Sequence, residues 1–175
     1  MIAASQVADR NQGAGASYRH AGEEESLDQR WDRLYRDCRD ELYRGACMLV
    51  GARDAEEVVQ EAFERAMREQ QFFERVDNPV GWLRVVAARQ ALSRLRRAQR
   101  WSAIQAFVRP APPPEADLDL AHALTTLPAT QRAAIVLRYY HGLDYAEIAA
   151  AVGIAPSSVG PLLTRARSAL RELVR

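Results

Sequence analysis

Hydrophobic residues recur at three- and four-residue steps near the start of the chain, which is the spacing of an amphipathic helix. Ser26 and Gln29 match a capping box that begins this helix, and its apolar positions are Leu27, Trp31, Leu34, Tyr35, Cys38, Leu42, Ala46 and Leu49. A second helix is expected after Gly51, with Asp54 as its N-cap. Its inward positions are Val58, Val59, Ala62, Phe63, Ala66 and Met67, and its other face is acidic and polar.

A third helix is predicted to begin at Asn78-Pro79, because asparagine caps a helix well and proline at the first helical position gives up an N–H that has no partner there. Its apolar positions are Trp82, Leu83, Val85, Val86, Leu92 and Leu95. Four of the five residues from Pro110 to Pro114 are prolines, which cannot continue a helix and favour extended geometry. We therefore place a domain boundary here.

More helical signals follow the prolines. A short helix is expected around Leu118–Leu124, and Pro128 opens a longer one that Gly142 ends. We predict an all-α protein of two small helical domains, joined by a Pro-rich linker and preceded by a disordered tail. The predicted bounds are 1–25 for the tail, 26–101 for the first domain, 102–116 for the linker and 117–175 for the second domain.

The last two predicted helices have the spacing of a helix-turn-helix. Asp144 and Glu147 form a capping box, Gly153 supplies the turn, and the final helix runs from about Pro156 to Val174. Ala149 stands where the helices cross and Val159 anchors the second one, with Ile148 and Leu162 on the core side. Such a motif places its second helix in the DNA major groove. A plain helical hairpin is the alternative, but the number of matched positions favours the motif.

The formal net charge of +1 conceals an uneven distribution of charge. Fifteen of the 23 acidic residues lie between Glu23 and Glu74, whereas residues 78–114 contain seven arginines and no acid. A cluster of arginines attracts phosphates in a salt-dependent manner. Either cluster could also be only a solvated face, so charge alone does not decide the function.

Other kinds of chemistry have little support. Cys38 and Cys47 fall on opposite faces of one predicted helix and cannot form a disulfide, and neither they nor His20, His122 and His141 have metal-ligand spacing. These histidines are assigned no role. No nucleophile–base pair, phosphate-binding loop, signal peptide or membrane-length apolar run is visible. We expect a cytoplasmic protein that is not an enzyme, needs no cofactor or metal and does not enter a membrane.

Both predicted domains resemble those of the extracytoplasmic-function (ECF) sigma factors, group 4 of the sigma-70 family. The run Leu127–Tyr140, followed by Gly142–Ala149, resembles sigma region 4, which reads the upstream (−35) promoter element. Three earlier runs resemble sigma region 2. Its polymerase-binding helices are matched by Arg33–Arg36 with Asp40–Tyr43 and by Asp54–Phe63, and the part that opens DNA at the downstream (−10) element is matched by Asn78–Leu83 with the arginine-rich helix.

The resemblance implies three sets of site residues. Contacts to core RNA polymerase, at the clamp helices of its largest subunit, are expected from Leu34, Tyr35, Asp54, Glu57, Gln60 and Glu61. Contacts to −10 DNA are expected from Arg84, Arg89, Gln90, Ser93, Arg94, Arg96 and Arg97. Contacts to −35 DNA are expected from Asp144, Tyr145, Ser157, Ser158, Gly160, Arg165 and Arg167. The implied partners are core polymerase and promoter DNA, and family members often have an anti-sigma factor as well.

The chain departs from the family pattern in both DNA-reading parts. Gly160-Pro161 stands where members commonly have a basic or polar pair, and a proline there is expected to kink the recognition helix near its first turns. We therefore predict weaker −35 recognition than is usual. Gln90 and Ser93 stand where the family tends to have asparagine and aspartate. Trp82 is predicted to be a core residue rather than a platform for base stacking.

Two other classes stay open on the residues alone. One is a stand-alone transcriptional regulator with a LuxR-like helix-turn-helix, which would bind operator DNA without polymerase. The other is a helical interaction module that has lost DNA binding. The preferred prediction is a sigma factor that binds core RNA polymerase and directs sequence-specific promoter recognition and transcription initiation.

Overall fold

The computed structural model describes residues 25–102 and 118–173, and all regular secondary structure in these ranges is helical. The all-α prediction is therefore confirmed. The predicted tail, apart from Glu25, and the predicted linker, apart from Ser102, lie outside the described residues. In chain order the elements are α2 (Leu27–Val50), α3 (Ala52–Arg68), α4 (Phe72–Arg75), α5 (Pro79–Ser102), α6 (Leu118–Thr126), α7 (Ala129–Ile135), η1 (Val136–Tyr140), α8 (Tyr145–Val152), η2 (Pro156–Ser158) and α9 (Val159–Leu173).

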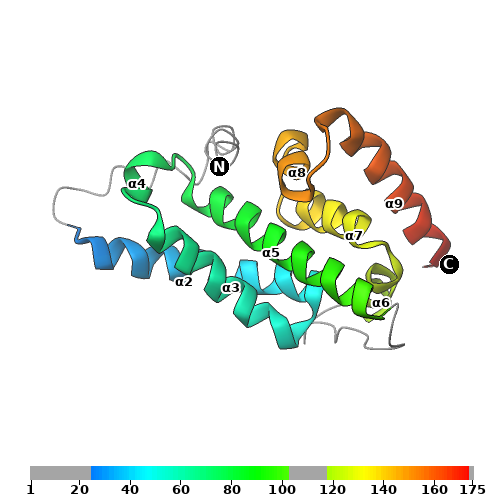
Figure 1. Cartoon of the computed structure of the whole chain (residues 1–175), viewed down its shortest axis with the longest axis horizontal. Helices are drawn as coiled ribbons and strands as arrows, with labels where there is room; N and C mark the ends of the chain where they lie inside the picture. The colour runs from blue at the N-terminus through cyan, green and yellow to red at the C-terminus, as the bar shows by residue number, and fades with distance from the viewer. Residues whose placement is uncertain (1–24, 103–117, 174–175) are drawn as a thin grey trace.

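Helices α2, α3 and α5 contact one another along their lengths and form a three-helix bundle (Figure 1). Their apolar faces meet in a core whose largest fully buried members include Leu34, Leu42, Val58 and Leu83. The short α4 adds Phe72 and Phe73, which pack on the indole rings of Trp31 and Trp82 with ring centroids 4.6–5.2 Å apart. Trp82 is thus a core residue, as predicted.

Side-chain caps begin two of these helices as the sequence predicts. Ser26 and Gln29 exchange capping-box hydrogen bonds at the start of α2, and the Asn78 side chain accepts a hydrogen bond of 2.9 Å from the Gly81 N–H at the start of α5. Two details differ. The N-cap of α3 is Gly51, at φ 85°, so Asp54 lies in the first turn, where its charge still complements the helix dipole. Met67 is 66% exposed, because it lies beyond the end of the apolar stripe.

The second half of the chain contains the predicted helix-turn-helix. Asp144 and Glu147 cap α8, and Gly153 ends it in the left-handed conformation at φ 76°. A bend of 99° separates Tyr145–Val152 from Pro156–Glu172, which is in the range of helix-turn-helix motifs. In the described residues no single helix has both the length and the apolarity to cross a membrane, and only this bent pair passes such a test jointly.

Pro161 does not kink the recognition helix. The segment predicted as one helix from Pro156 divides into a 3-10 turn at Pro156–Ser158 and the α-helix α9, which begins at Val159. Pro161 therefore lies in the first turn of α9, where backbone N–H groups have no partner within the helix, so the proline removes no helical hydrogen bond. The prediction of a kink was wrong because the α-helix begins three residues later than expected.

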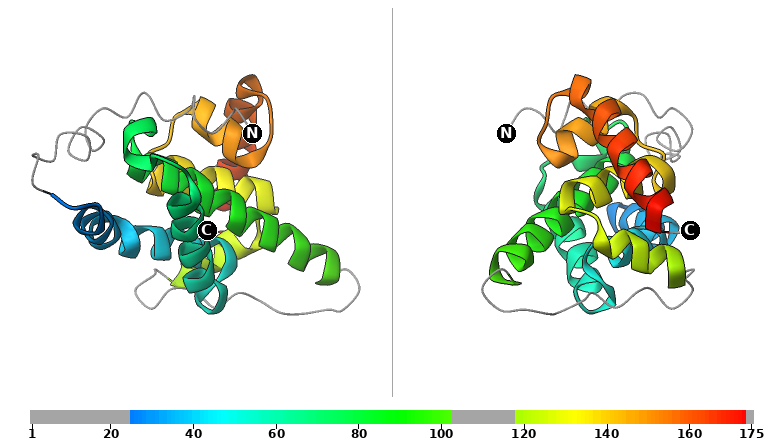
Figure 2. Two further views of the ribbon diagram at one scale, coloured as in Figure 1. Left: turned by 60° about the vertical axis from the view of Figure 1, so that its left-hand side comes forward. Right: turned by 90° about the vertical axis from the view of Figure 1, so that its right-hand side faces the viewer.

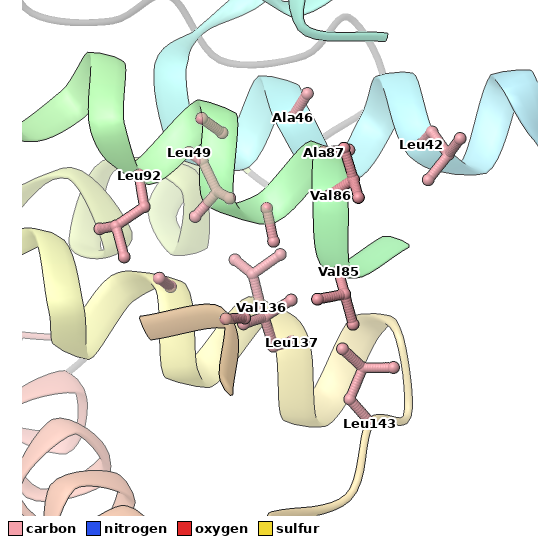
Figure 3. Packing of buried hydrophobic residues seen from close by; sticks show 14 of the residues in the cluster. Leu42, Ala46, Leu49, Val85, Val86, Ala87, Leu92, Val136, Leu137 and Leu143 are labelled. Atoms are coloured by element: carbon pink, nitrogen blue, oxygen red, sulfur yellow. The ribbon is translucent and has the colours of Figure 1, made fainter. Parts of the chain in front are cut away.

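The two halves of the molecule pack against each other (Figures 1 and 2). Helix α5 contacts α7 and α8, and α2 contacts η1, α6 and α7. Figure 3 shows apolar side chains from both halves meeting in the shared core, namely Leu42, Leu49, Val85, Val86 and Leu92 from the first half and Val136, Leu137 and Leu143 from the second. One buried cluster therefore runs through both halves.

Candidate polymerase and nucleic-acid interfaces

The outer face of α3 is acidic and polar. Asp54, Glu57, Gln60 and Glu61 follow one another at helical spacing on this face, and Glu57 is the most open of its ion-paired carboxylates, with 62% of its side chain exposed. We call these four residues the acidic face. Its apolar underside is buried against α2 and α5, so the carboxylates are held on a rigid helix.

The two α2 residues predicted to contact polymerase have different places in the structure. Tyr35 is 44% exposed and its ring packs on Phe63 of α3, with centroids 5.0 Å apart. Leu34 is completely buried and presents no surface to a partner in this structure. An apolar side chain at this register points into the bundle, where Leu34 is part of the buried core.

Arg94 of α5 joins two sets of residues that the sequence predicted to have separate roles. Its guanidinium donates to Glu57 at 2.7 Å and also to Glu61. The hydrogen bond and charge of Arg94 lower the pKa of Glu57 from its ordinary value. A residue predicted to contact DNA is therefore bound to two residues predicted to contact polymerase.

The other arginines of α5 differ in their surroundings. Arg89 donates to the carbonyl oxygen of Ala150, and Arg96 donates to that of Val152, so both lie against the C-terminal end of α8. Arg97 and Ser93 are exposed, whereas Gln90 is half-buried. A groove of about 370 Å³ between α5 and α8 is lined by Arg89, Leu92, Ser93, Arg96, Ala151, Val152 and Gly153.

Arg84 belongs to a polar cluster between α2, α5 and the end of η1. It donates two hydrogen bonds of 2.8 Å to the Glu41 carboxylate, which also lies 2.9 Å from His141 Nδ1. Burial alone raises the pKa of Glu41, but the hydrogen bonds from His141 and Arg84 outweigh it and lower the pKa to about 2. His141, which the sequence left without a role, is thus a buried contact between the two halves.

Arg132 is a second buried contact that sequence reasoning missed. Its side chain is nearly inaccessible and donates to the carbonyl oxygens of Leu49, at 3.1 Å, and Thr125, at 2.6 Å. Burial lowers the pKa of this guanidinium to about 10. Arg132 thereby joins the C-terminal end of α2 to the C-terminal end of α6.

The predicted −35 residues lie on the helix-turn-helix. Ser157 and Ser158 are exposed on η2, and Arg165 and Arg167 are exposed on α9. Tyr145, at the start of α8, is 47% exposed, and the guanidinium of Arg138 lies 5.6 Å from its ring centroid. The side chain of Asp144 serves as the N-cap of α8. A Cβ on Gly160 would meet the Tyr145 ring at 3.7 Å, an ordinary contact, so close packing does not require glycine there.

Metal and thiol chemistry have no candidate site in the residues that the structure describes. No group of three or more potential His, Cys, Asp or Glu ligands occurs there. Cys38 and Cys47 are free, as their spacing predicted, and both are buried. Burial raises the pKa of the Cys38 thiol to about 12, which makes it a poor nucleophile at neutral pH.

Comparison with known proteins identifies both halves. A model of sigma-70 region 2 matches residues 34–101, and a model of sigma-70 region 4 matches residues 117–170. The ECF RNA polymerase sigma factor SigE of Mycolicibacterium smegmatis is 34% identical over 157 residues, which cover 81% of this chain and 60% of SigE. The ECF sigma factor SigL of Mycobacterium tuberculosis is 32% identical over 142 residues, covering 74% of this chain and 80% of SigL.

A solved structure matches most of this chain. The sigma factor RpoE of Bartonella quintana, in a co-crystal with the anti-sigma factor NepR, matches with a TM-score of 0.62 and 28% identity. The match covers 82% of this chain and 97% of that one. The LuxR-like regulator and the interaction module are not favoured by these matches. The chain belongs to the ECF family of RNA polymerase sigma factors, which are transcription initiation factors.

Proposed function

We propose that this chain binds core RNA polymerase through the acidic face and Tyr35, and directs transcription initiation at specific promoters without catalysing a covalent step itself. The main support for this proposal is that a rigid acidic helix and a helix-turn-helix occur in one chain, in the order of sigma regions 2 and 4. Exposed carboxylates complement a basic docking surface. Such complementary charges orient the two partners and increase their association rate, and they also contribute to affinity. The proposed docking surface is the clamp helices of the largest polymerase subunit.

The DNA contacts are proposed for two surfaces. On α5, Arg97 and Ser93 are open to solvent and Gln90 is half-buried. Arg89 and Arg96 border the groove, and Arg84 and Arg94 pair with acids. On the helix-turn-helix, Arg165 and Arg167 supply attraction to phosphates. The start of α9 carries only uncharged residues, so the arginine-to-guanine contacts that give strong base discrimination are missing there. Recognition of the −35 element is therefore proposed to be weak.

An anti-sigma factor is a further proposed partner. The Bartonella quintana RpoE structure is a complex with the anti-sigma factor NepR, and this chain matches nearly the whole of that sigma factor. The cytoplasm, where core polymerase is located, is the proposed site of action. Copurification of the chain with a second protein that blocks transcription by the holoenzyme would test this partner.

Reconstitution with core polymerase tests the main proposal. Purified chain is added to core enzyme on fragmented genomic DNA, and the transcripts are sequenced. We expect transcripts that begin at defined positions and require the chain. Free chain that shifts DNA but directs no initiation would instead indicate a stand-alone regulator, and failure to associate with core enzyme at any salt concentration would refute the sigma assignment for this chain.

A matched pair of variants localises the polymerase contact. Glu57→Arg reverses a charge on the acidic face, whereas Glu69→Arg reverses an exposed charge at the C-terminal end of the same helix. We expect the first variant to lose most core binding and the second to retain it. Equal binding by both variants would exclude the acidic face as the docking surface.

A further inference from the structure

The start of α9 presents two uncharged residues on its exposed side. This helix is the second of the helix-turn-helix and lies at the edge of the molecule in Figure 1. Its buried residues, which define the core side of the helix, are Val159, Leu162, Leu163 and Ala166. The exposed residues of its first two turns are Pro161, Thr164 and Arg165. We call Pro161 and Thr164 the apolar pair.

Both members of the apolar pair point away from the core. Each residue rotates a helix by about 100°, so Pro161, two positions after Val159, and Thr164, five positions after it, lie within about 40° of the direction opposite Val159. Residues three positions apart are neighbours on a helix surface. In a helix-turn-helix, the start of the second helix contacts base edges in the major groove. The apolar pair is therefore placed to meet base edges.

Neither side chain of the apolar pair has a hydrogen-bond donor left for a base. The ring of Pro161 carries only carbon atoms beyond its backbone nitrogen, which has no hydrogen. The Thr164 hydroxyl donates to the carbonyl oxygen of Gly160, at 3.1 Å, so its hydrogen is already used within the helix. Guanine shows only acceptors in the major groove, N7 and O6, and needs a donor from the protein. The apolar pair cannot supply one.

Cations flank the apolar pair on both sides. Gly160 faces Tyr145, because a Cβ on Gly160 would lie 3.7 Å from Tyr145 Cε2, and the exposed Arg138 has its guanidinium 5.6 Å from the centroid of that tyrosine ring. Arg165 is exposed on the other side, about 140° around the helix from Gly160. Phosphate contacts position a protein on duplex DNA without reading its sequence. Base selection is thus left to the surface between the cations.

Thymine is the base that matches an apolar surface in the major groove, because only thymine has a C5-methyl group there, and groups such as the threonine methyl contact it. We propose that Pro161 and Thr164 select thymine in the upstream promoter element through apolar contact with this C5-methyl group. This inference rests on the proposed function, and it names the base that the helix-turn-helix selects.

Promoter selection by the holoenzyme measures the preference. Core polymerase reconstituted with the chain is mixed with duplex DNA whose upstream element is randomised and whose downstream part comes from a promoter found by transcript sequencing. The DNA that remains in complexes resistant to competitor is sequenced. We expect thymine to be enriched at fixed upstream positions. Enrichment of guanine there, or no enrichment at all, would overturn the inference.

Base analogues isolate the methyl group. Deoxyuridine in place of an enriched thymine removes only the C5-methyl, and 5-methylcytosine places a methyl at the same point of a C·G pair. Burial of one methyl group corresponds to about fourfold in affinity, so the uracil promoter should bind more weakly than the thymine promoter by about this factor. The 5-methylcytosine promoter should bind more tightly than the cytosine promoter. Equal binding of the thymine and uracil promoters would exclude the methyl contact.

Two substitutions at position 164 form a matched pair. Thr164→Ser removes the methyl group and keeps the hydroxyl, whereas Thr164→Val keeps a methyl group and removes the hydroxyl. We expect the uracil effect to shrink in Thr164→Ser and to persist in Thr164→Val, and the reverse order would contradict the inference. Pro161→Arg supplies donors and should shift the preference towards guanine. Ser168→Ala, exposed two turns beyond Pro161, is the control and should retain the uracil effect.

The results separate this inference from the proposed function. A holoenzyme that starts transcription at defined positions but binds thymine and uracil promoters equally would refute the inference alone and leave the sigma function standing. A folded chain that forms no promoter complex with core polymerase would refute the proposed function, and the inference would fall with it. Circular dichroism confirms that each variant is folded.

Discussion

Arg84 and Glu41 form a two-pronged ion pair, with both hydrogen bonds at 2.8 Å, between α5 and α2. His141, from the other half of the molecule, lies at hydrogen-bond distance from the same carboxylate. We expect Glu41→Gln to lower the free energy of unfolding by about 1–3 kcal/mol, because it removes charge-assisted hydrogen bonds from a largely enclosed group. Urea denaturation of wild type and variant measures the difference. Asp40→Asn, at an exposed neighbouring position, is the control.

The same carboxylate predicts a pH dependence. The pKa of Glu41 is about 2 in the folded protein, below its ordinary value of 4.5, so the folded state holds the charged form more strongly than the unfolded state does. Its stabilisation is therefore complete above pH 4.5 and is lost as the pH falls towards 2. The difference in urea midpoint between wild type and Glu41→Gln should be largest near neutral pH and should shrink through this window. A difference that stays constant would contradict the assignment.

The contacts of Arg94 couple the proposed polymerase-binding surface of region 2 to its proposed DNA-binding surface. Because its guanidinium is bound to Glu57 and Glu61, Arg94→Ala leaves both carboxylates free for a basic partner. If the acidic face docks on polymerase, this variant should bind core enzyme about as tightly as wild type or more tightly, and its association rate should depend more steeply on salt. Stopped-flow association at several salt concentrations measures the effect. Markedly weaker binding by a folded Arg94→Ala protein would show that Arg94 itself is required.

Gly153 provides a test of the helix-turn-helix turn. Its φ of 76° is a conformation that strains any residue with a Cβ, while the space around a Cβ at this position is empty. Gly153→Ala should therefore destabilise the protein through backbone strain alone, by about 1–2 kcal/mol. Gly153→Asn should cost less, since asparagine tolerates the left-handed region. Thermal unfolding of the two variants gives the order, and a reversed order would contradict this explanation.

The two cysteines report on the packing of α2. Cys38 and Cys47 are buried, and burial raises the pKa of Cys38 to about 12 and also raises that of Cys47. Both thiols should react with a colorimetric thiol reagent far more slowly at pH 8 than they do in urea, where two equivalents should react promptly. Rapid reaction of the folded protein would show that the bundle opens at α2.

The parts of the structure that the sequence predicted well are those that short-range chemistry determines. The capping boxes at Ser26 and Asp144, the start at Asn78 and the turn at Gly153 each depend on residues within a few positions of one another. The four-residue α4 was missed, because hydrophobic periodicity can be recognised only over a longer segment. The N-cap of α3 was misplaced because a glycine, which gives no side-chain signal, begins the helix.

The polar contacts between the halves could not be predicted in the same way. Arg132 meets the Leu49 carbonyl oxygen across 83 residues, and His141 meets Glu41 across 100 residues. Nothing near either residue in the sequence indicates its partner. The contacts of Arg89 and Arg96 with α8 could not be predicted either. In the sequence, an arginine that donates to the end of a neighbouring helix has the same local pattern as one that binds a phosphate. Only the packing of α5 on α8 distinguishes them.

The π-helical turn at η1 sets the direction of His141. Within it the His141 N–H bonds to the Val136 carbonyl oxygen, five positions back, where an α-helix would use four. Such a turn is equivalent to an α-helical turn with one inserted residue, and each residue rotates a helix by about 100°. A homologue with a one-residue gap here would aim its equivalent of His141 elsewhere. Alignment gaps at this turn should therefore separate sigma factors that have the His141–Glu41 contact between their halves from those that lack it.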